Sequence, residues 1–134
     1  MADTWETLTA LPSARRNPGN GDAAIGTKVY LVGGQGTGFV YLKTLAIYDS
    51  IANSWSTGAD YPLSGREWIT VGVIGGKLYA VGGYNGTAFK TGEVYDPGAD
   101  SWSAIADAPA VVEETAGVVH GGYLYVCGGA MYRY

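Results

Sequence analysis

Short apolar runs alternate with turn-forming residues along the whole chain. In the middle of the sequence these runs cover residues 68–74, 78–81, 93–95 and 102–106, and each is about as long as a typical strand. Glycine and proline separate them, in the segments 75–77 and 96–98, which contain the residue types that tight turns favour. The pattern predicts four short strands in this segment and no long helix.

The same arrangement recurs along the chain. Its tryptophans, Trp5, Trp55 and Trp102, are 50 and 47 residues apart, and a proline follows each of them after seven residues. Each unit also carries a tyrosine and, three residues later, a pair of glycines, which indicates close backbone approach at the end of a strand. The tyrosines and glycines are Tyr30, Tyr79, Tyr125, Gly33, Gly34, Gly82, Gly83, Gly128 and Gly129. Repeated units of four strands predict an all-β fold of β-propeller blades.

The residues of this repeat resemble the kelch motif. The resemblance rests on the tryptophan, the proline, an arginine four residues after the proline, the segment Leu-Tyr-Ala-Val-Gly-Gly at 78–83 and the segment Val-Tyr-Asp-Pro at 94–97. It extends over essentially the whole chain and implies kelch-type blades, each a four-stranded antiparallel sheet. The third unit departs from the pattern, because Glu113 stands where the arginine is expected.

The repeat divides a single domain, residues 1–134, into unequal parts. Residues 4–11 match the fourth, outer strand of a blade. Residues 12–59 and 60–108 match two blades, and residues 109–134 match a third blade without its fourth strand. The two ends are therefore complementary. We expect residues 4–11 of one chain to complete the last blade of another, so that a homodimer forms a six-bladed ring. The alternative is a fragment of a longer propeller.

Composition and charge narrow the possible partners. The chain has 8 basic and 12 acidic residues, a net charge of −4, and no basic run, which argues against nucleic acid and anionic membranes as partners. The start has no apolar leader, and no run reaches the roughly 20 apolar residues of a membrane span. We therefore expect a soluble, cytoplasmic protein. One cysteine, Cys127, and one histidine, His120, do not make the usual zinc site, and no metal or cofactor is expected.

Candidate binding residues lie in the segments that enter each first strand. The kelch resemblance places Arg16, Arg66 and Glu113 near the mouth of the channel, with the arginine charge facing the opening. Arginines there could bind an acidic peptide or protein through bidentate hydrogen bonds, with apolar contact from the loop residues Trp68, Tyr84 and Phe89. The alternative is that the arginines bind loop carbonyls or pair with neighbouring acids, and then no ligand is needed.

The resemblance implies a non-enzymatic scaffold that binds a protein or another ligand. Cys127 and His120 occupy repeat positions that hold apolar strand residues in the other units, so we expect no catalytic role for them. Two alternatives remain open. Some bacterial kelch propellers act on sugars, so the chain could be an enzyme of the sialic-acid epimerase (mutarotase) type that uses Arg16, Arg66 and Glu113. It could also be an engineered or fragment propeller that assembles with itself and binds no ligand.

Overall fold

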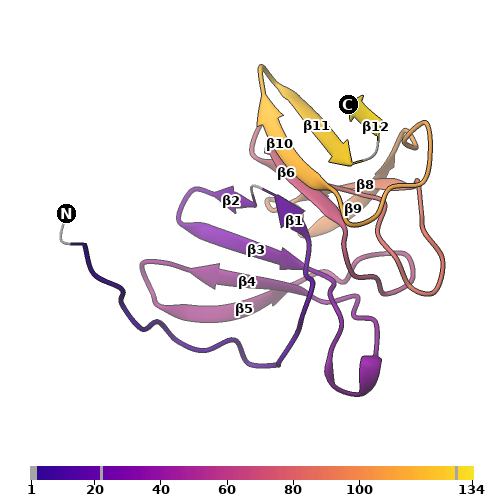
Figure 1. The fold of residues 1–134 in the computed structure, drawn as a ribbon. Coiled ribbons are helices and arrows are strands. Elements are labelled where there is room, and N and C mark those ends of the chain that lie inside the picture. The colour runs from indigo at the N-terminus through magenta and orange to yellow at the C-terminus, as the bar shows by residue number, and fades with distance from the viewer. Residues whose placement is uncertain (1–2, 22, 129) are drawn as a thin grey trace.

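The computed structural model describes residues 3–21, 23–128 and 130–134, and it forms three antiparallel sheets that lie side by side (Figure 1). Blade 1 consists of β2 (Ala24–Ile25), β3 (Lys28–Val32), β4 (Leu45–Asp49) and β5 (Ser54–Gly58). Blade 2 consists of β6 (Thr70–Ile74), β7 (Lys77–Val81), β8 (Gly92–Asp96) and β9 (Ser101–Ile105). Blade 3 has β10 (Ala116–His120), β11 (Tyr123–Gly128) and β12 (Ala130–Arg133). The all-β fold of propeller-type blades is therefore confirmed.

The strands of each blade pair in chain order, as expected for sheets built from consecutive hairpins. The turn between β6 and β7 shows why, since Gly75 and Gly76 both have positive φ, at 59° and 76°. Such two-residue turns match the twist of the strands that they join. A further short strand, β1 (Asn20–Gly21), pairs in parallel with β6 of the next blade. Among the described residues the only helix is the 3₁₀ turn η1 (Thr37–Phe39), and no helix there has the length and apolar character to cross a membrane.

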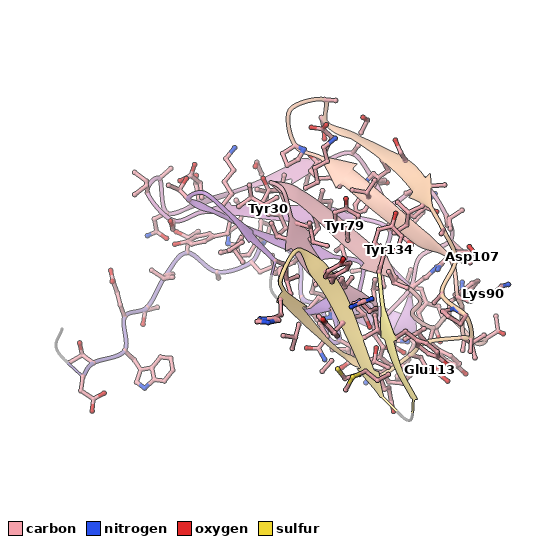
Figure 2. All side chains as sticks on the ribbon, turned by 90° about the horizontal axis from the view of Figure 1, so that it is seen from above. Tyr30, Tyr79, Lys90, Asp107, Glu113 and Tyr134 are labelled. Atoms are coloured by element: carbon pink, nitrogen blue, oxygen red, sulfur yellow. The ribbon has the colours of Figure 1, made fainter. Side chains whose placement is uncertain are left out.

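The N-terminal segment was predicted to be an outer strand. In the described part of the chain, residues 3–11 join no sheet. The residues before Thr9 run away from the three blades (Figures 1 and 2), whereas Thr9 itself is bound to blade 1. Trp5 is fully exposed, whereas Trp55 and Trp102 are half-buried in their blades. Pairing of this segment with a second copy stays a prediction.

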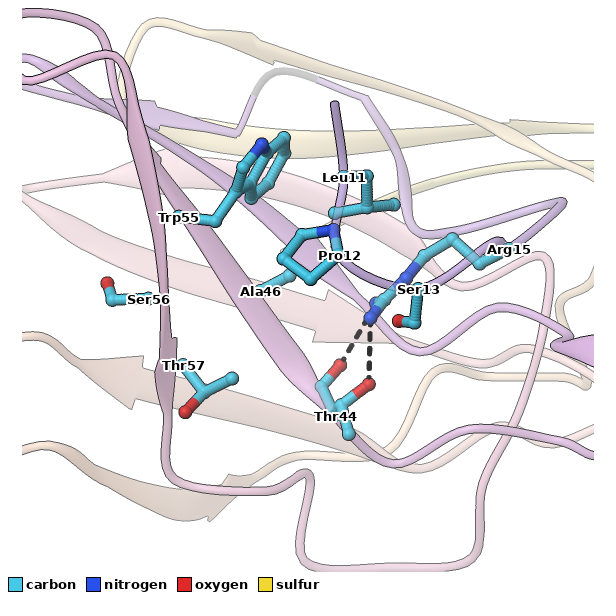
Figure 3. A pocket seen from close by; sticks show the side chains of 9 residues that line it. All are labelled: Leu11, Pro12, Ser13, Arg15, Thr44, Ala46, Trp55, Ser56 and Thr57. Atoms are coloured by element: carbon cyan, nitrogen blue, oxygen red, sulfur yellow. Dashed lines mark hydrogen bonds between the residues drawn. The ribbon is translucent and has the colours of Figure 1, made fainter. Parts of the chain in front are cut away.

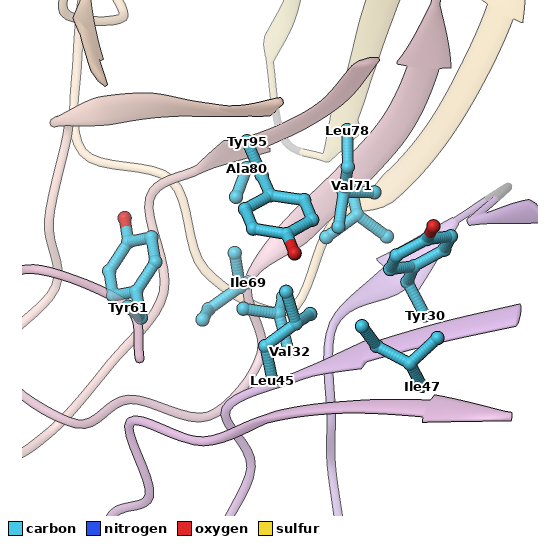
Figure 4. Packing of buried hydrophobic residues seen from close by; sticks show 10 residues of the cluster. All are labelled: Tyr30, Val32, Leu45, Ile47, Tyr61, Ile69, Val71, Leu78, Ala80 and Tyr95. Atoms are coloured by element: carbon cyan, nitrogen blue, oxygen red, sulfur yellow. The ribbon is translucent and has the colours of Figure 1, made fainter. Parts of the chain in front are cut away.

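The core lies between the blades rather than inside any one of them. Blades 1 and 2 and their linker enclose one cluster, shown in Figure 4: Tyr30, Val32, Leu45, Ile47, Tyr61, Ile69, Val71, Leu78, Ala80 and Tyr95. A second cluster joins blades 2 and 3: Val81, Val112, Leu124 and Val126. Leu78 and Leu124, at the same place in β7 and β11, are 0% exposed, whereas Val29 at this place in β3 is 40% exposed. Within the described residues, the outer face of blade 1 therefore has no neighbouring sheet.

The glycine pairs of blades 1 and 2 make the predicted close approach, and they connect neighbouring blades. Gly129 of the third predicted pair lies outside the described residues. A Cβ atom on Gly82 would collide with the carbonyl oxygen of Val112. The next residue, Gly83, donates its N–H to the same oxygen at 2.7 Å, and Gly34 donates to the carbonyl of Arg66 at 2.7 Å. The pairs are required because the backbones of two blades meet there with no room for a side chain.

We expect Gly82→Ala to lower the free energy of unfolding by about 3 kcal/mol or more, because it adds a backbone collision to the cost of a left-handed conformation. Gly75→Ala is the matched control, since Gly75 also has positive φ, at 59°, but has nothing within 4 Å of its added Cβ. It should cost only about 1 kcal/mol. Urea unfolding measures both values. Equal losses would show that the approach of the blades does not require glycine.

Candidate functional site

Arg66 lies inside the molecule and binds the backbone. Its side chain is 1% exposed. Its Nη1 donates to the carbonyl of Gly82 at 2.9 Å and to Oγ1 of Thr91 at 2.8 Å, and the guanidinium stacks on the ring of Phe89 at 3.8 Å. The expectation that this charge faces an opening is therefore wrong for Arg66, because the cation is buried against the two ends of the loop that joins β7 and β8. Phe89 packs against it there.

Arg15 holds the same place in blade 1 (Figure 3). Its Nη1 donates to the carbonyl of Gly33 at 3.1 Å and its Nη2 donates to Oγ1 of Thr44 at 3.0 Å, which are the repeat positions that Arg66 binds in blade 2. Burial lowers the pKa of both arginines from the ordinary value of 12.5. Each side chain therefore acts as a structural cation within its blade.

The kelch resemblance assigned Arg16 and Glu113 to the repeat position of Arg66. In the structure each of them lies one residue after that position. In blade 3 this position is held by Val112. Its carbonyl accepts a hydrogen bond from the N–H of Gly83, just as the carbonyl of Arg66 accepts one from the N–H of Gly34. The physical reason is the length of the linker, because the distance from proline to arginine is three residues in blade 1 and four in blade 2.

Arg16 is exposed on a loop of blade 1. Its guanidinium donates to Oε1 of Gln35, at 2.8 Å through Nε, and lies over the ring of Phe39 at 4.8 Å. Glu113 is also exposed, on the segment before blade 3. Both charges face solvent, and their contact with a ligand stays a prediction.

Three strained loop residues gather at a pocket between the blades. Asn17, Trp68 and Glu114 have positive φ, at 50°, 56° and 50°, and they occupy the same place before each first strand. Together with the β1 segment they line a pocket of about 440 Å³. Tyr84 packs on Trp68, with ring centroids 5.6 Å apart, so the structure brings together two of the aromatic residues predicted for the site. Strained backbone persists where the surrounding structure over-determines it, and it is frequent at binding sites.

Two titratable groups inside the molecule have raised pKa values. Burial raises the pKa of Tyr61 to about 12. Burial also raises the pKa of Glu93, and the charge of Arg66 partly opposes this shift. Among the residues that the structure describes, no group of three or more histidine, cysteine or acidic side chains could hold a metal ion.

A second set of contacts closes each complete blade, and we call it the aromatic clasp. In blade 2 it consists of Tyr95, Asp100 and Trp102, together with Ala59 of the preceding linker. Oδ1 of Asp100 accepts from Oη of Tyr95 and from the N–H of Ala59, both at 2.7 Å. Nε1 of Trp102 donates to the carbonyl of Ala59 at 2.8 Å, and the rings of Tyr95 and Trp102 lie 5.1 Å apart. The clasp ties the outer strand to the linker.

Blade 1 has the same clasp, formed by Tyr48, Asn53, Trp55 and Thr9. Oδ1 of Asn53 accepts from Oη of Tyr48 at 2.8 Å and from the N–H of Thr9 at 2.9 Å. Nε1 of Trp55 donates to the carbonyl of Thr9 at 2.9 Å, and its ring lies 5.1 Å from that of Tyr48. Sequence reasoning missed the clasp, although its signal is visible as an aspartate or asparagine two residues before each tryptophan, at Asp3, Asn53 and Asp100.

Comparison with known proteins agrees with this geometry. The family model of the Kelch motif matches residues 69–109. Among solved structures, 145 chains match. One is the structure of YjhT, which is 26% identical, covers 91% of this chain and superposes with a TM-score of 0.78. The match spans only 36% of the YjhT chain. No curated protein matches. The chain therefore contains a Kelch motif at residues 69–109, and its fold is similar to that of the YjhT structure.

We expect Arg66→Ala to destabilise the chain by about 2–4 kcal/mol, because it leaves a cavity and two buried acceptors without their donor. Arg66→Lys should recover only part of the loss, since an ammonium cannot reproduce the planar stacking of the guanidinium. Arg16→Ala is the control and should cost under about 1 kcal/mol, because this side chain is exposed. Thermal unfolding compares the three variants. An Arg66→Ala variant as stable as Arg16→Ala would contradict the structural role.

The clasp gives blade 2 a dependence on pH. The hydrogen bonds from Tyr95 and from the N–H of Ala59 hold the pKa of Asp100 below its ordinary value of 3.8. This stabilisation is complete above the ordinary pKa and is lost as the pH falls through the lowered one. Asp100→Asn, which copies Asn53 of blade 1, should therefore lose less stability than the parent chain between pH 6 and pH 3.

Thermal midpoints across this pH range measure the effect. The reciprocal variant, Asn53→Asp, should make the loss on acidification steeper. Identical pH profiles for Asp100→Asn and the parent chain would show that the clasp carboxylate does not contribute to stability.

Proposed function

We propose that this chain is a non-enzymatic kelch-type scaffold that closes a ring with a second copy of itself. The observation that carries the proposal is the mismatch of its two ends. The N-terminal segment has the sequence of a fourth strand but lies outside every sheet, with Trp5 fully exposed. Blade 3 has three strands, and no described residue pairs with the outer edge of β12.

The apolar surfaces at the two ends of the arc support closure. Val29 on blade 1 and Val118, Met131 and Tyr134 on blade 3 are large apolar side chains that face solvent. Apolar surface on the outermost sheets of a repeat array favours association. A two-fold ring buries both ends with the same contact used twice, which is the economical arrangement for identical copies.

The state of the arginines favours a scaffold over an enzyme. The cation of Arg66 and much of that of Arg15 are directed at backbone carbonyls, so these groups are not free to bind a sugar or to stabilise a transition state. The exposed Arg16 and the pocket beside Trp68 leave a surface for a ligand at the loops. We infer that an acidic peptide is the kind of partner that this surface would accept.

The mass in solution tests the proposal. Light scattering on a size-exclusion column should give twice the mass of the chain, and deletion of residues 1–8 should return it to the monomer mass. The deletion stops before Thr9 because Thr9 binds Asn53 and Trp55 in blade 1. A parent chain that is a well-folded monomer at high concentration would overturn the proposal.

A further inference from the structure

We propose that the pocket beside Trp68, here called the loop pocket, binds a primary ammonium group of the kind carried by a lysine side chain or a peptide N-terminus. The pocket has a volume of about 440 Å³ and is lined by Asn17, Pro18, Gly19, Asn20, Trp68 and Glu114. These residues come from the segments that enter all three blades of one chain. The proposal therefore goes beyond the ring closure proposed above and does not depend on it.

The loop pocket is formed before a ligand enters, because backbone hydrogen bonds hold its wall together. The N–H of Trp68 donates to the carbonyl of Asn17 at 3.1 Å, and the N–H of Asn20 donates to the carbonyl of Ile69 at 2.7 Å. The strand β1, which contains Asn20, also pairs with β6 of the next blade. A site whose backbone is already ordered loses little conformational entropy when it binds a ligand.

Both amide side chains of the lining are oriented by acceptors of the protein. Nδ2 of Asn17 donates to Oε2 of Glu67 at 2.8 Å, and Nδ2 of Asn20 donates to the carbonyl of Thr115 at 3.2 Å. A carboxylate and a carbonyl only accept, so each amide directs its nitrogen at them. The oxygens Oδ1 of Asn17 and Asn20 accept no hydrogen bond from the described residues, and both are available to a ligand that donates.

The charge of the lining favours a cation. Among the described residues, the only charged side chain of the lining is that of Glu114, which is exposed and belongs to neither ion pair. Glu67, which orients Asn17, is 4% exposed and also has no basic partner within the described part of the chain. A carboxylate taken out of water is costly unless an opposite charge lies near it. A bound cation would supply that charge.

Trp68 adds an aromatic face to these acceptors. Its side chain is half-buried and packs on Tyr84, with ring centroids 5.6 Å apart, so the indole is held in place. Among aromatic side chains, tryptophan attracts cations most strongly. The two amide oxygens and the carboxylate of Glu114 also provide one acceptor for each of the three N–H donors of an ammonium. The lining therefore matches this group in both charge and hydrogen bonding.

Arg16 is not part of the loop pocket, although it precedes Asn17 in the chain. Its guanidinium binds Gln35 and lies over the ring of Phe39, and none of these three residues belongs to the lining. The loops therefore offer a cation and, next to it, a site for a cation. A peptide that carries an acidic side chain and a free ammonium group is complementary to both, which adds a second charge to the acidic peptide inferred above.

Titration followed by NMR tests the ammonium group. One probe is Nα-acetyl-lysine amide, whose only charge is the side-chain ammonium, and the other is glycylglycine amide, whose only charge is the N-terminal ammonium. The indole N–H signal of Trp68, assigned by its loss in Trp68→Asn, is the readout. At least one probe should shift this signal to saturation, and the tighter probe identifies the source of the ammonium. The acetylated form of each probe, which lacks the charge, should give no shift.

A matched pair of variants locates the site. Glu114→Gln should weaken binding of the lysine or dipeptide probe at least about fivefold, because a charged acceptor is replaced by a neutral one. Glu113→Gln is the control, since Glu113 is exposed and adjacent in sequence but does not line the pocket. It should change the affinity by less than about twofold, because water and salt screen its charge.

Trp68→Asn tests the aromatic face, with the side-chain amide signal of Asn20 as the readout. Asparagine stands at the equivalent place in blade 1, at Asn17, and it tolerates the positive φ of 56° that Trp68 adopts. The variant should therefore stay folded, which the dispersion of its NMR signals checks. Binding should weaken about two- to fivefold, the amount expected for one exposed contact between a cation and an aromatic ring.

Three results would overturn the proposal. The first is that neither probe binds more tightly than its acetylated form. The second is that Glu114→Gln and Glu113→Gln weaken binding equally, because binding would then follow the net charge of the chain. The third is that Trp68→Asn binds as tightly as the parent chain, which would place the site elsewhere. Failure of the ring closure would change none of these outcomes, because one chain supplies the whole lining.

Discussion

The constraint on which this structure depends is that no blade can bury its own faces. A sheet of four short strands has two broad surfaces, and the two core clusters of the described residues lie between adjacent sheets. Stability therefore comes from the junctions, as in other repeat proteins in which each unit contacts only its neighbours. The exposure of Val29, set against the complete burial of Leu78 at the same place in the next blade, shows how much a single missing neighbour leaves uncovered.

Three kinds of contact define a junction, and they act at different points along the blade. Glycine pairs let the backbones meet, the clasp ties the outer strand to the preceding linker, and the arginine binds both ends of the loop between the second and third strands. A buried guanidinium without an acidic partner in hydrogen-bond contact is costly unless its donors are used. Arg66 stacks on Phe89 and its Nη1 donates to two oxygens, whereas its buried Nε has no hydrogen-bond partner among the described residues. In blade 2 this repeat position therefore binds its own blade, with one donor left unused.

Much of this architecture was predictable from the sequence, because strand length and turn chemistry are local properties. The four strands of blade 2 and the approach at its glycine pair follow from the spacing of Trp102, Tyr79 and Gly82. The repeat position of the arginine was not predictable by counting from the proline, because the linker before blade 2 has one extra residue between the two. Only the backbone contacts between the blades show which residues are equivalent. The loop pocket escaped notice because Asn17, Trp68 and Glu114 share a conformation and not a chemical type.

The clasp explains how an open sheet edge can be specific rather than merely adhesive. The outer edge of a strand such as β12, which has no neighbouring strand on that side among the described residues, offers backbone groups that any extended peptide could bind. Backbone pairing alone does not select a register. The clasp selects one register, because the aspartate or asparagine, the tryptophan and the linker can all reach the tyrosine only when the outer strand is paired at one position along the edge. Within the chain this offset recurs twice, at Asn53 and at Asp100. The segment that contains Asp3 and Trp5 carries the same spacing, and this spacing is the feature by which the ring closure proposed above can be selective.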